Sequence, residues 1–209
     1  MSVSDRTTSR LGTRPAHGRR RAAADTATRI LDIGERLAQS RGFNGFSYAD
    51  IAAELHITRA SLHYHFPGKA ELGEALIERY SARFAGALET IDARVPEARA
   101  KLDAYVDLYA DVLRRKRMCL CGILAAEYQT LPKPMREAVI RFFSENEGWL
   151  VGVLERGRAD GAFSYEDTPG DAAHTIVSGL EGAMLLARPT GDLQRFRSAA
   201  ERLVATVTR

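Results

Sequence analysis

Apolar side chains recur along this chain at the spacing of helices, and no stretch alternates with the two-residue period of a strand. From Ala27 to Ala38 they return every three or four residues, and the pattern stops before Gly42. Glycine readily adopts the left-handed conformation that ends helices. The pattern therefore predicts a first helix that begins at about residue 22 and ends at Arg41.

Two short helices follow. Ser47 and Asp50 stand at the spacing of a capping box and predict the start of the second helix, which runs to about residue 55. His56 begins a tight break, and Thr58 offers an N-cap for a third helix over Arg59–Phe66. Two short helices joined by about three residues are typical of a helix-turn-helix.

The rest of the chain predicts further helices and no sheet. Their approximate ranges are 69–95, 102–113, 119–129, 135–160, 169–188 and 193–207. Thr168 and Pro169 mark one of these starts well, because threonine caps helices and proline is favoured at their first position. The expected fold class is all-α with about nine helices, in which a three-helix N-terminal domain precedes a larger helical domain.

Composition narrows the class of protein. The chain has 209 residues, 45% of them apolar, and no apolar run of the length that a membrane span needs. The first 25 residues lack the apolar core of a signal peptide, so we expect a cytoplasmic protein without contact to a membrane. The only cysteines, Cys119 and Cys121, match neither a disulfide framework nor a paired metal site.

Positive charge is concentrated at the N-terminal end. The formal net charge is +3, and residues 1–80 account for it with 12 Lys and Arg against 9 Asp and Glu. Residues 1–20 have few large apolar side chains, so we expect them to be disordered. This basic arm indicates an anionic partner, although a solvated tail without a partner has the same composition.

The third predicted helix has side chains that suit the major groove of DNA. Arg59 and Ser61 are able to hydrogen-bond to base edges or phosphates, and Ala60 to contact a thymine methyl group. His63 and Tyr64 are expected to reach backbone oxygens. The alternative is that this polar cluster is simply surface.

The segment from Ser47 to Leu72 resembles the DNA-binding signature of the TetR family of bacterial transcriptional regulators. The resemblance rests on the order and spacing of Ile51-Ala52, the turn, the His63–Phe66 run and Lys69. It implies an all-α homodimer with three DNA-binding helices and a C-terminal domain that holds an effector pocket and the dimer interface. By position, Thr58, Arg59, Ser61, His63 and Tyr64 would belong to the recognition helix and its phosphate contacts, and Ser47 and Lys69 would contact the DNA backbone.

Two positions depart from the family pattern. His56 stands where the family usually has glycine, in a turn that needs a left-handed residue, so we expect a strained turn. His63 stands where an aromatic residue, commonly tyrosine, is usual. Because histidine titrates near neutrality, a phosphate contact at this position is expected to depend on pH.

We expect three regions: a basic arm over 1–21, a helix-turn-helix domain over 22–68, and an effector-binding and dimerisation domain over 69–209. Aromatic and apolar residues of the last region are candidates for the pocket lining, although each is also what a plain helical core would contain. They are Tyr105, Tyr109, Cys121, Leu124, Tyr128, Phe142, Phe143, Trp149 and Met184. Glu127, Asp107 and Asp111 are candidate pocket acids or solvated surface charges.

Two further features allow alternatives. In one continuous helix Cys119 and Cys121 would lie about 200° apart and would not face one partner together. One of them is a candidate reactive thiol beside the basic run 114–117, or both are buried and inert. The helix over 171–187 is rich in small residues, which suits either a two-fold interface or close packing within one subunit.

We therefore expect a ligand-responsive repressor that binds a palindromic DNA operator as a homodimer and is released by an unidentified small molecule. An activator or an effector-independent DNA binder is the alternative within regulation, and a helical small-molecule carrier is the alternative from another class. The sequence has no phosphate-binding glycine loop, nucleophile elbow or HExxH motif, so no enzyme, cofactor or metal is expected.

Overall fold

The computed structural model describes the backbone of residues 16–208 and the side chains of residues 24–208. This part of the chain forms nine α-helices and two short 3-10 helices, with one isolated β-bridge between Phe163 and Thr208. The helices are α1 (Ala16–Arg41), α2 (Tyr48–Leu55), α3 (Arg59–His65), α4 (Lys69–Arg94), α5 (Ala98–Arg114), α6 (Leu120–Ala126), η1 (Tyr128–Thr130), α7 (Lys133–Ala159), α8 (Pro169–Ala187), η2 (Arg188–Thr190) and α9 (Leu193–Ala205). The predicted all-α fold class is confirmed.

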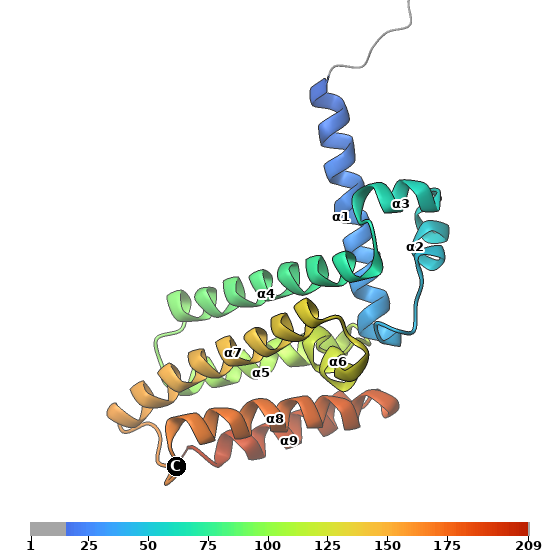
Figure 1. Cartoon of the computed structure of the whole chain (residues 1–209). Coiled ribbons are helices and arrows are strands. Elements are labelled where there is room, and N and C mark those ends of the chain that lie inside the picture. The colour runs from blue at the N-terminus through green and yellow to red at the C-terminus, as the bar shows by residue number, and fades with distance from the viewer. Residues whose placement is uncertain (1–15, 209) are drawn as a thin grey trace, which may run out of the picture.

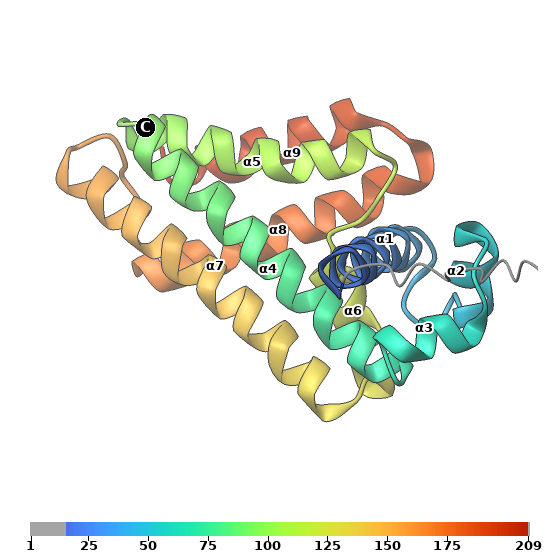
Figure 2. The same cartoon turned by 90° about the horizontal axis from the view of Figure 1, so that it is seen from above.

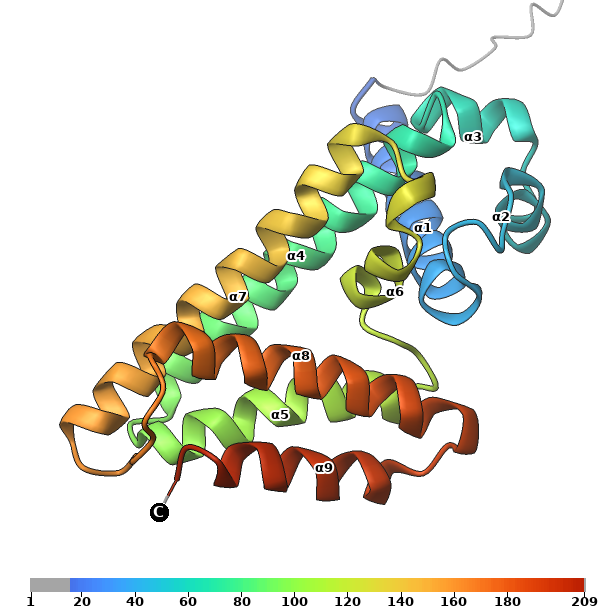
Figure 3. The same ribbon diagram turned by 60° about the horizontal axis from the view of Figure 1, so that its bottom comes forward.

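Helices α1 to α3 gather at one end of the molecule, and α4 to α9 form a larger bundle beside them (Figure 1). Within the bundle α4 packs against α7, α7 against α8, and α8 against α9 (Figure 3). Helix α1 crosses the near end of α4 and also contacts α6 (Figures 1 and 2). No helix in the described residues is both long and apolar enough to cross a membrane.

Local sequence signals set the helix ends around the turn. The Thr58 hydroxyl accepts a hydrogen bond from the amide of Ser61 at 3.1 Å, which caps α3 as predicted. The Asp50 carboxylate accepts the amide and the hydroxyl of Ser47 at 2.7 and 2.6 Å, so the predicted start of α2 is confirmed. Gly42, with φ of 86°, ends α1 in the left-handed conformation.

Several boundaries differ from the sequence-based predictions, and α5 begins at Ala98 instead of about residue 102. Helix α1 begins at Ala16, so residues 16–20, which we expected to be disordered, are helical; residues 1–15 lie outside the described residues. Alanine and arginine are strong helix formers, which favours the longer helix. The helix predicted over 119–129 is shorter, because Cys119 is its N-cap and the chain tightens into η1 after Glu127.

His56 ends α2 in the left-handed region, with φ of 55° and ψ of 41°, as its place in the turn predicted. Its amide still donates to the carbonyls of Ala52 and Ala53, so the helix end is capped. A left-handed backbone costs an L-residue about 1–2 kcal/mol, because Cβ approaches the following carbonyl oxygen. The turn therefore carries a strain that glycine would not have.

We expect His56→Gly to raise the free energy of unfolding by about 0.5–1 kcal/mol, since the relieved strain exceeds the extra entropy of glycine in the unfolded chain. Urea unfolding followed by circular dichroism measures the change. Ala53→Gly is the matched control at an exposed position inside the same helix, and it should destabilise by about 1 kcal/mol. Equal destabilisation by both variants would contradict the strained turn.

Candidate nucleic-acid interface and effector region

Helix α3 presents a polar face to solvent. Arg59, Ala60, His63 and Tyr64 are exposed, and 79% of the Tyr64 surface is accessible. Leu62, on the opposite side of the helix, is fully buried and anchors α3 to the rest of the N-terminal helices. Burial of Leu62 therefore orients α3 so that Arg59 and Tyr64 are accessible to a partner molecule.

Tyr48 holds the far end of α3 in place, a role that the sequence analysis missed. Its hydroxyl is placed to donate to the carbonyls of Phe66 and Gly68, at 2.9 and 2.5 Å, and its ring lies 4.9 Å from that of His63. Burial, aided by the negative charge of Glu71, raises the pKa of Tyr48 to about 12. The only signal in the sequence was an aromatic residue at the first position of α2.

Four of the predicted DNA-contacting residues border one surface hollow of about 350 Å³. They are Ser47, Arg59, His63 and Lys69, which come from the starts of α2, α3 and α4 and from the middle of α3. His63 Nδ1 is hydrogen-bonded to the carbonyl of Pro67 at 2.9 Å, which leaves Nε2 for another partner. The fold therefore brings together residues that are 22 positions apart in the chain.

Lys69 turns its amine toward the turn that precedes α2. Nζ donates to the carbonyl of Phe46 and lies 4.8 Å from the ring centroid of Phe43 and 4.6 Å from that of Phe46. Burial lowers the pKa of Lys69, and the carboxylates of Glu127 and Asp50 oppose this shift. Lys69 thus fastens the start of α4 to the turn, and a phosphate contact would be a second role.

Glu127 joins the same turn to the larger bundle. Its Oε2 accepts the amide of Phe43 at 2.7 Å, and its Oε1 accepts the amide of Asn44 at 3.2 Å. The Asn44 side chain also donates to the hydroxyl of Thr130 at 2.7 Å. A Cβ at Gly42 would lie 2.7 Å from Glu127 Oε1, so glycine also provides the space for this contact. We call Glu127 with these two amides the carboxylate clamp.

Helix α1 makes a second polar attachment to the bundle. Gln39 Nε2 donates to the carbonyl of Met118 at 2.9 Å, and the amide of Met118 donates back to the carbonyl of Gln39 at 3.1 Å. The buried Glu35 pairs with Arg79 and Arg83 of α4, at 2.9 and 2.5 Å. The N-terminal helices are therefore held to the bundle by directional contacts, which break when the two parts shift.

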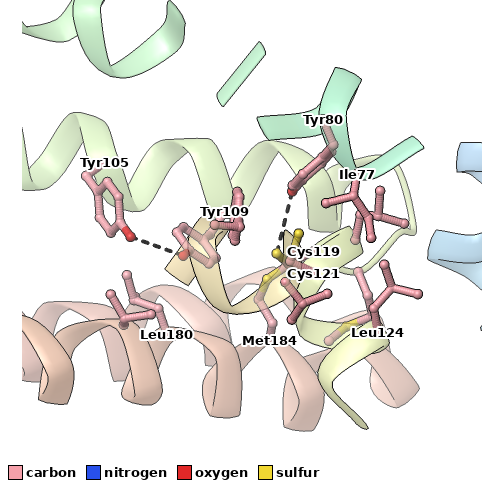
Figure 4. Close-up of a cluster of buried hydrophobic side chains, with 14 of the residues drawn as sticks. Ile77, Tyr80, Tyr105, Tyr109, Cys119, Cys121, Leu124, Leu180 and Met184 are labelled. Carbon is pink, nitrogen blue, oxygen red and sulfur yellow. Dashed lines mark hydrogen bonds between the residues drawn. The ribbon is translucent and has the colours of Figure 1, made fainter. Parts of the chain in front are cut away.

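Six of the predicted pocket residues are buried in the bundle core. They are Tyr105, Tyr109, Cys121, Leu124, Phe142 and Met184. The hydroxyls of Tyr105 and Tyr109 lie 3.1 Å apart, and Tyr80 is placed to donate to the Cys119 sulfur at 3.6 Å (Figure 4). Tyr80 and Phe84 of α4 belong to this cluster of rings and were not among the predicted residues, although both stand in the apolar pattern of that helix.

The other three predicted pocket residues are half-buried, and they differ in how they contact the ring cluster. Trp149 stacks on Tyr105 with ring centroids 5.5 Å apart, and its indole donates to Asp92 at 2.8 Å. Phe143 contacts Phe142 at the edge of the cluster. Tyr128 lies on η1 under the guanidinium of Arg136 and makes none of the ring contacts of the cluster.

Glu181 of α8 places a carboxylate in this core. Its Oε1 is buried and has no hydrogen-bond partner in the described part of the chain, and a Cβ at Gly122 would overlap the carboxylate. Burial raises the pKa of Glu181 to about 7, and contact with the Cys119 thiol opposes the shift. Glu181 is the only carboxylate between Ala172 and Ala187, and this isolation within an apolar helix was the signal for it.

The Glu181 carboxylate contacts Cys119, and its charge also acts on Cys121, whereas the expected separation of the two cysteines by about 200° assumed one continuous helix. Cys119 is the extended N-cap of α6, so the spacing of a continuous helix does not apply to it. Both thiols are free and buried. Burial, followed by the charge of Glu181, raises the pKa of each thiol. This favours the inert thiol over the reactive thiolate.

Of the three candidate pocket acids, only Asp111 borders a cavity that rings of the cluster also line, and all three have polar partners. Glu127 forms the carboxylate clamp, Asp107 pairs with Arg197 at 2.7 Å, and Asp111 pairs with Arg114. Their places at helix ends and on outer faces explain this, since charged groups avoid burial without a partner. Within the described residues, no three His, Cys, Asp or Glu side chains are grouped so as to hold a metal ion.

Comparison with known proteins identifies the family. Residues 30–76 match the family model described as bacterial regulatory proteins, tetR family, and residues 98–203 match the tetracyclin repressor-like C-terminal domain. This chain belongs to the TetR family. The resemblance of the helix-turn-helix segment is thereby confirmed, and the TetR-family match extends over both the N-terminal helices and the bundle.

Relatives and solved structures agree with this assignment. The chain is 27% identical to the transcriptional regulator AcuR of Cereibacter sphaeroides over 84% of this chain and 83% of that protein. It is 25% identical to the HTH-type transcriptional repressor NemR of Escherichia coli over 84% of this chain and 90% of that protein. A TetR-family regulator from Agrobacterium tumefaciens superposes with a TM-score of 0.87 at 30% identity, covering 90% of this chain and all of the other. The protein is a DNA-binding transcriptional regulator of the TetR family and not an enzyme.

Proposed function

We propose that this regulator is a repressor that binds a palindromic operator as a homodimer and leaves it when a small molecule binds. The observation that supports DNA recognition most strongly is the face of α3, where Arg59, His63 and Tyr64 are exposed while Leu62 is fully buried. The name of one relative, a transcriptional repressor, supports repression over activation. A palindromic operator follows from two-fold symmetry, since each subunit brings one recognition helix.

Helix α8 supports self-association. Leu185 and Leu186 are 59% and 61% exposed near its C-terminal end. The small residues Ser178 and Gly182 are also exposed, whereas Ala173 is buried within the subunit. Neighbouring exposed leucines beside small residues allow the close approach of a second copy of the same helix. The exposed small residues thus support the two-fold interface, whereas Ala173 packs within the subunit.

Two helices connect the bundle core to the DNA-binding end. Lys69, the first residue of α4, contacts the turn before α2 through its amine. Farther along the same helix, Tyr80 lies in the core. At the start of α6, Cys119 and Gly122 lie against Glu181. At its end, Glu127 accepts a hydrogen bond from the turn before α2. A ligand that displaces core side chains would therefore shift both attachments and change the separation of the two recognition helices.

We expect Arg59→Ala and Ser61→Ala each to weaken operator binding by about 1–3 kcal/mol, because each removes hydrogen bonds to bases or phosphates. The operator is first mapped by footprinting the purified protein on DNA that flanks its own gene. Fluorescence anisotropy with the mapped duplex then measures each affinity, with and without candidate ligands.

Arg141→Ala on α7 is the matched control, since Arg141 is equally exposed and far along the chain from α3. It should leave operator affinity within experimental error of the wild type. Unchanged affinity in both α3 variants would remove the recognition-helix assignment. Steep salt dependence of binding is also expected, because phosphate contacts release counterions, and a small-molecule carrier would not show it. Occupancy that raises transcription would favour the activator alternative.

A further inference from the structure

A cavity of about 270 Å³ lies at the junction of α1, α4 and α5, next to the ring cluster of the core, and shares Tyr80 and Phe84 with it. Glu35 and Gln39 of α1 form one wall, so the cavity includes residues of the N-terminal helices as well as of the bundle. Its volume is slightly below the range of about 300–1,000 Å³ that is typical of pockets for drug-sized ligands. It is therefore suited to a small molecule.

Three arginines and two carboxylates, Glu35 and Asp111, line this junction cavity, and both carboxylates already have arginine partners. Of its three arginines, Arg83 is paired with Glu35 at 2.5 Å. Arg115 and Arg117 make no ion pair with any residue whose side chain the structure describes, because Asp111 is already paired with Arg114. Two guanidinium groups without a counterion at one cavity form an attractive site for an anion.

The environment of Arg117 adds to this picture. The side chain of Arg117 is half-buried, and burial lowers its pKa. The positive charges of Arg115 and Arg83 lower this pKa further, and only the negative charge of Glu35 raises it. Arginine stays charged in proteins, so the crowding is relieved by a bound anion and not by loss of a proton.

The other side of the cavity is apolar. The rings of Tyr80 and Phe84 and the side chains of Leu108 and Val112 line it. In the wall between the two sides, Gln39 Oε1 is buried and has no hydrogen-bond partner in the described part of the chain. An amide oxygen needs a hydrogen-bond donor, so this atom is not a partner for an anion, and anion binding depends on the guanidinium groups of the opposite side.

We propose that the junction cavity binds a small aromatic carboxylate, with its carboxylate on Arg117 and Arg115 and its ring against Phe84 and the neighbouring aliphatic side chains. The pairing of planar carboxylate and guanidinium groups gives orientation as well as affinity. The ring buries apolar surface that is now half-exposed.

Such a ligand acts on the attachment of α1. It sits beside Glu35 and Gln39, and its negative charge competes with Glu35 for Arg83. Loss of that ion pair, together with displacement of Gln39 from Met118, loosens the helix that carries the DNA-binding end. This regulatory part of the inference rests on the proposed function, whereas binding of the carboxylate does not.

Isothermal titration calorimetry of the full-length protein without DNA tests the binding. Benzoate is the probe, benzamide is its neutral isostere, and inorganic phosphate is an anion without a ring. We expect saturable binding of benzoate at millimolar concentrations. Benzamide and phosphate should bind more weakly by about tenfold or more, because benzamide lacks the negative charge and phosphate lacks the aromatic ring.

Arg117→Gln and Arg115→Gln are expected to weaken benzoate binding about tenfold each. Arg115 is exposed, so its variant tests the site even if the Arg117 variant is less stable. Arg99→Gln is the matched control, because Arg99 is exposed on α5, pairs with Asp103 and does not line the cavity. Absence of saturable benzoate binding, equal binding of benzamide or phosphate, or full affinity in both variants would overturn the proposal.

Operator DNA separates this inference from the proposed function. If saturating benzoate weakens operator binding by the wild type but not by Arg117→Gln, the cavity is a regulatory site. Benzoate binding without any change in operator affinity would keep the anion site and refute its effect on DNA. A protein that binds benzoate but no operator would instead overturn the proposed function while leaving the site intact.

Discussion

Glu181→Gln should remove a pH dependence of stability that amounts to about 3 kcal/mol in the wild-type protein. The folded protein raises the pKa of the Glu181 carboxyl from 4.5 to about 7, chiefly by burial. A raised carboxyl pKa means that the folded state favours the protonated form. The wild type therefore loses free energy of unfolding as the pH rises from about 4.5 to about 7, and no further loss from this group follows above that range.

The groups around Glu181 offer no compensation for its charge. Tyr105 and Tyr109 of α5 and Cys119 and Cys121 of α6 are influenced by the carboxylate, and each is neutral at this pH. No lysine or arginine contributes to the shift of Glu181. Glutamine has nearly the same shape and no titratable group, so the free energy of burying its side chain does not change with pH.

Urea unfolding of both proteins between pH 5 and pH 8 measures the effect. The difference between wild type and Glu181→Gln should favour the variant increasingly as the pH rises. Glu155→Gln is the control, because Glu155 is exposed on α7, and its curve should run parallel to that of the wild type. Parallel curves for Glu181→Gln as well would show that the carboxylate is not buried in solution.

Glu127→Ala should lower the free energy of unfolding by about 2–3 kcal/mol and weaken operator binding as well. A hydrogen bond to a charged acceptor is worth about 1.5–3 kcal/mol. Of the two bonds in the clamp, the one from Asn44 is exposed and adds little. The clamp holds the amides of Phe43 and Asn44, and the rings of Phe43 and Phe46 in that turn surround the Lys69 amine. Without it, the turn that leads into α2 loses its attachment to the bundle.

Urea unfolding and fluorescence anisotropy on the mapped operator give the two readouts for the clamp. Glu137→Ala is the matched control, since Glu137 is exposed and makes only a surface ion pair with Lys133 at 3.7 Å. Its effect on stability should be below about 1 kcal/mol. If Glu127→Ala were as mild as this control, or if it destabilised the protein without any loss of operator affinity, the clamp would not connect the two parts.

The residues of the DNA-binding end were largely predictable, because their signals are local. The Ser47 and Thr58 caps, the left-handed Gly42 and the spacing of the short helices act over a few neighbouring residues. The same local rules underlie the resemblance to the TetR family. The left-handed conformation of His56 was implied by that resemblance, because the family usually has glycine at this position.

The core of the bundle was only partly predictable. Helical periodicity identified Tyr105, Tyr109 and Phe142 as inward-facing, and the structure buries all three. It did not show that Tyr128 differs from these residues. Tyr128 lies outside the cluster because α6 ends before it and the chain continues as η1. Periodicity fixes the face of a helix that a side chain occupies, but not which of the neighbouring helices that face meets.

What the sequence by itself determined is the set of helices, their caps and the helix-turn-helix, all of which depend on interactions within about four residues of the chain. The tertiary structure alone decided the partners of the charged groups. Glu127 reaches an amide 84 positions away, and Glu35 finds Arg83 at a separation of 48. Such contacts exist only once the helices have packed, because burial then makes an unpaired charge too costly to leave without a partner.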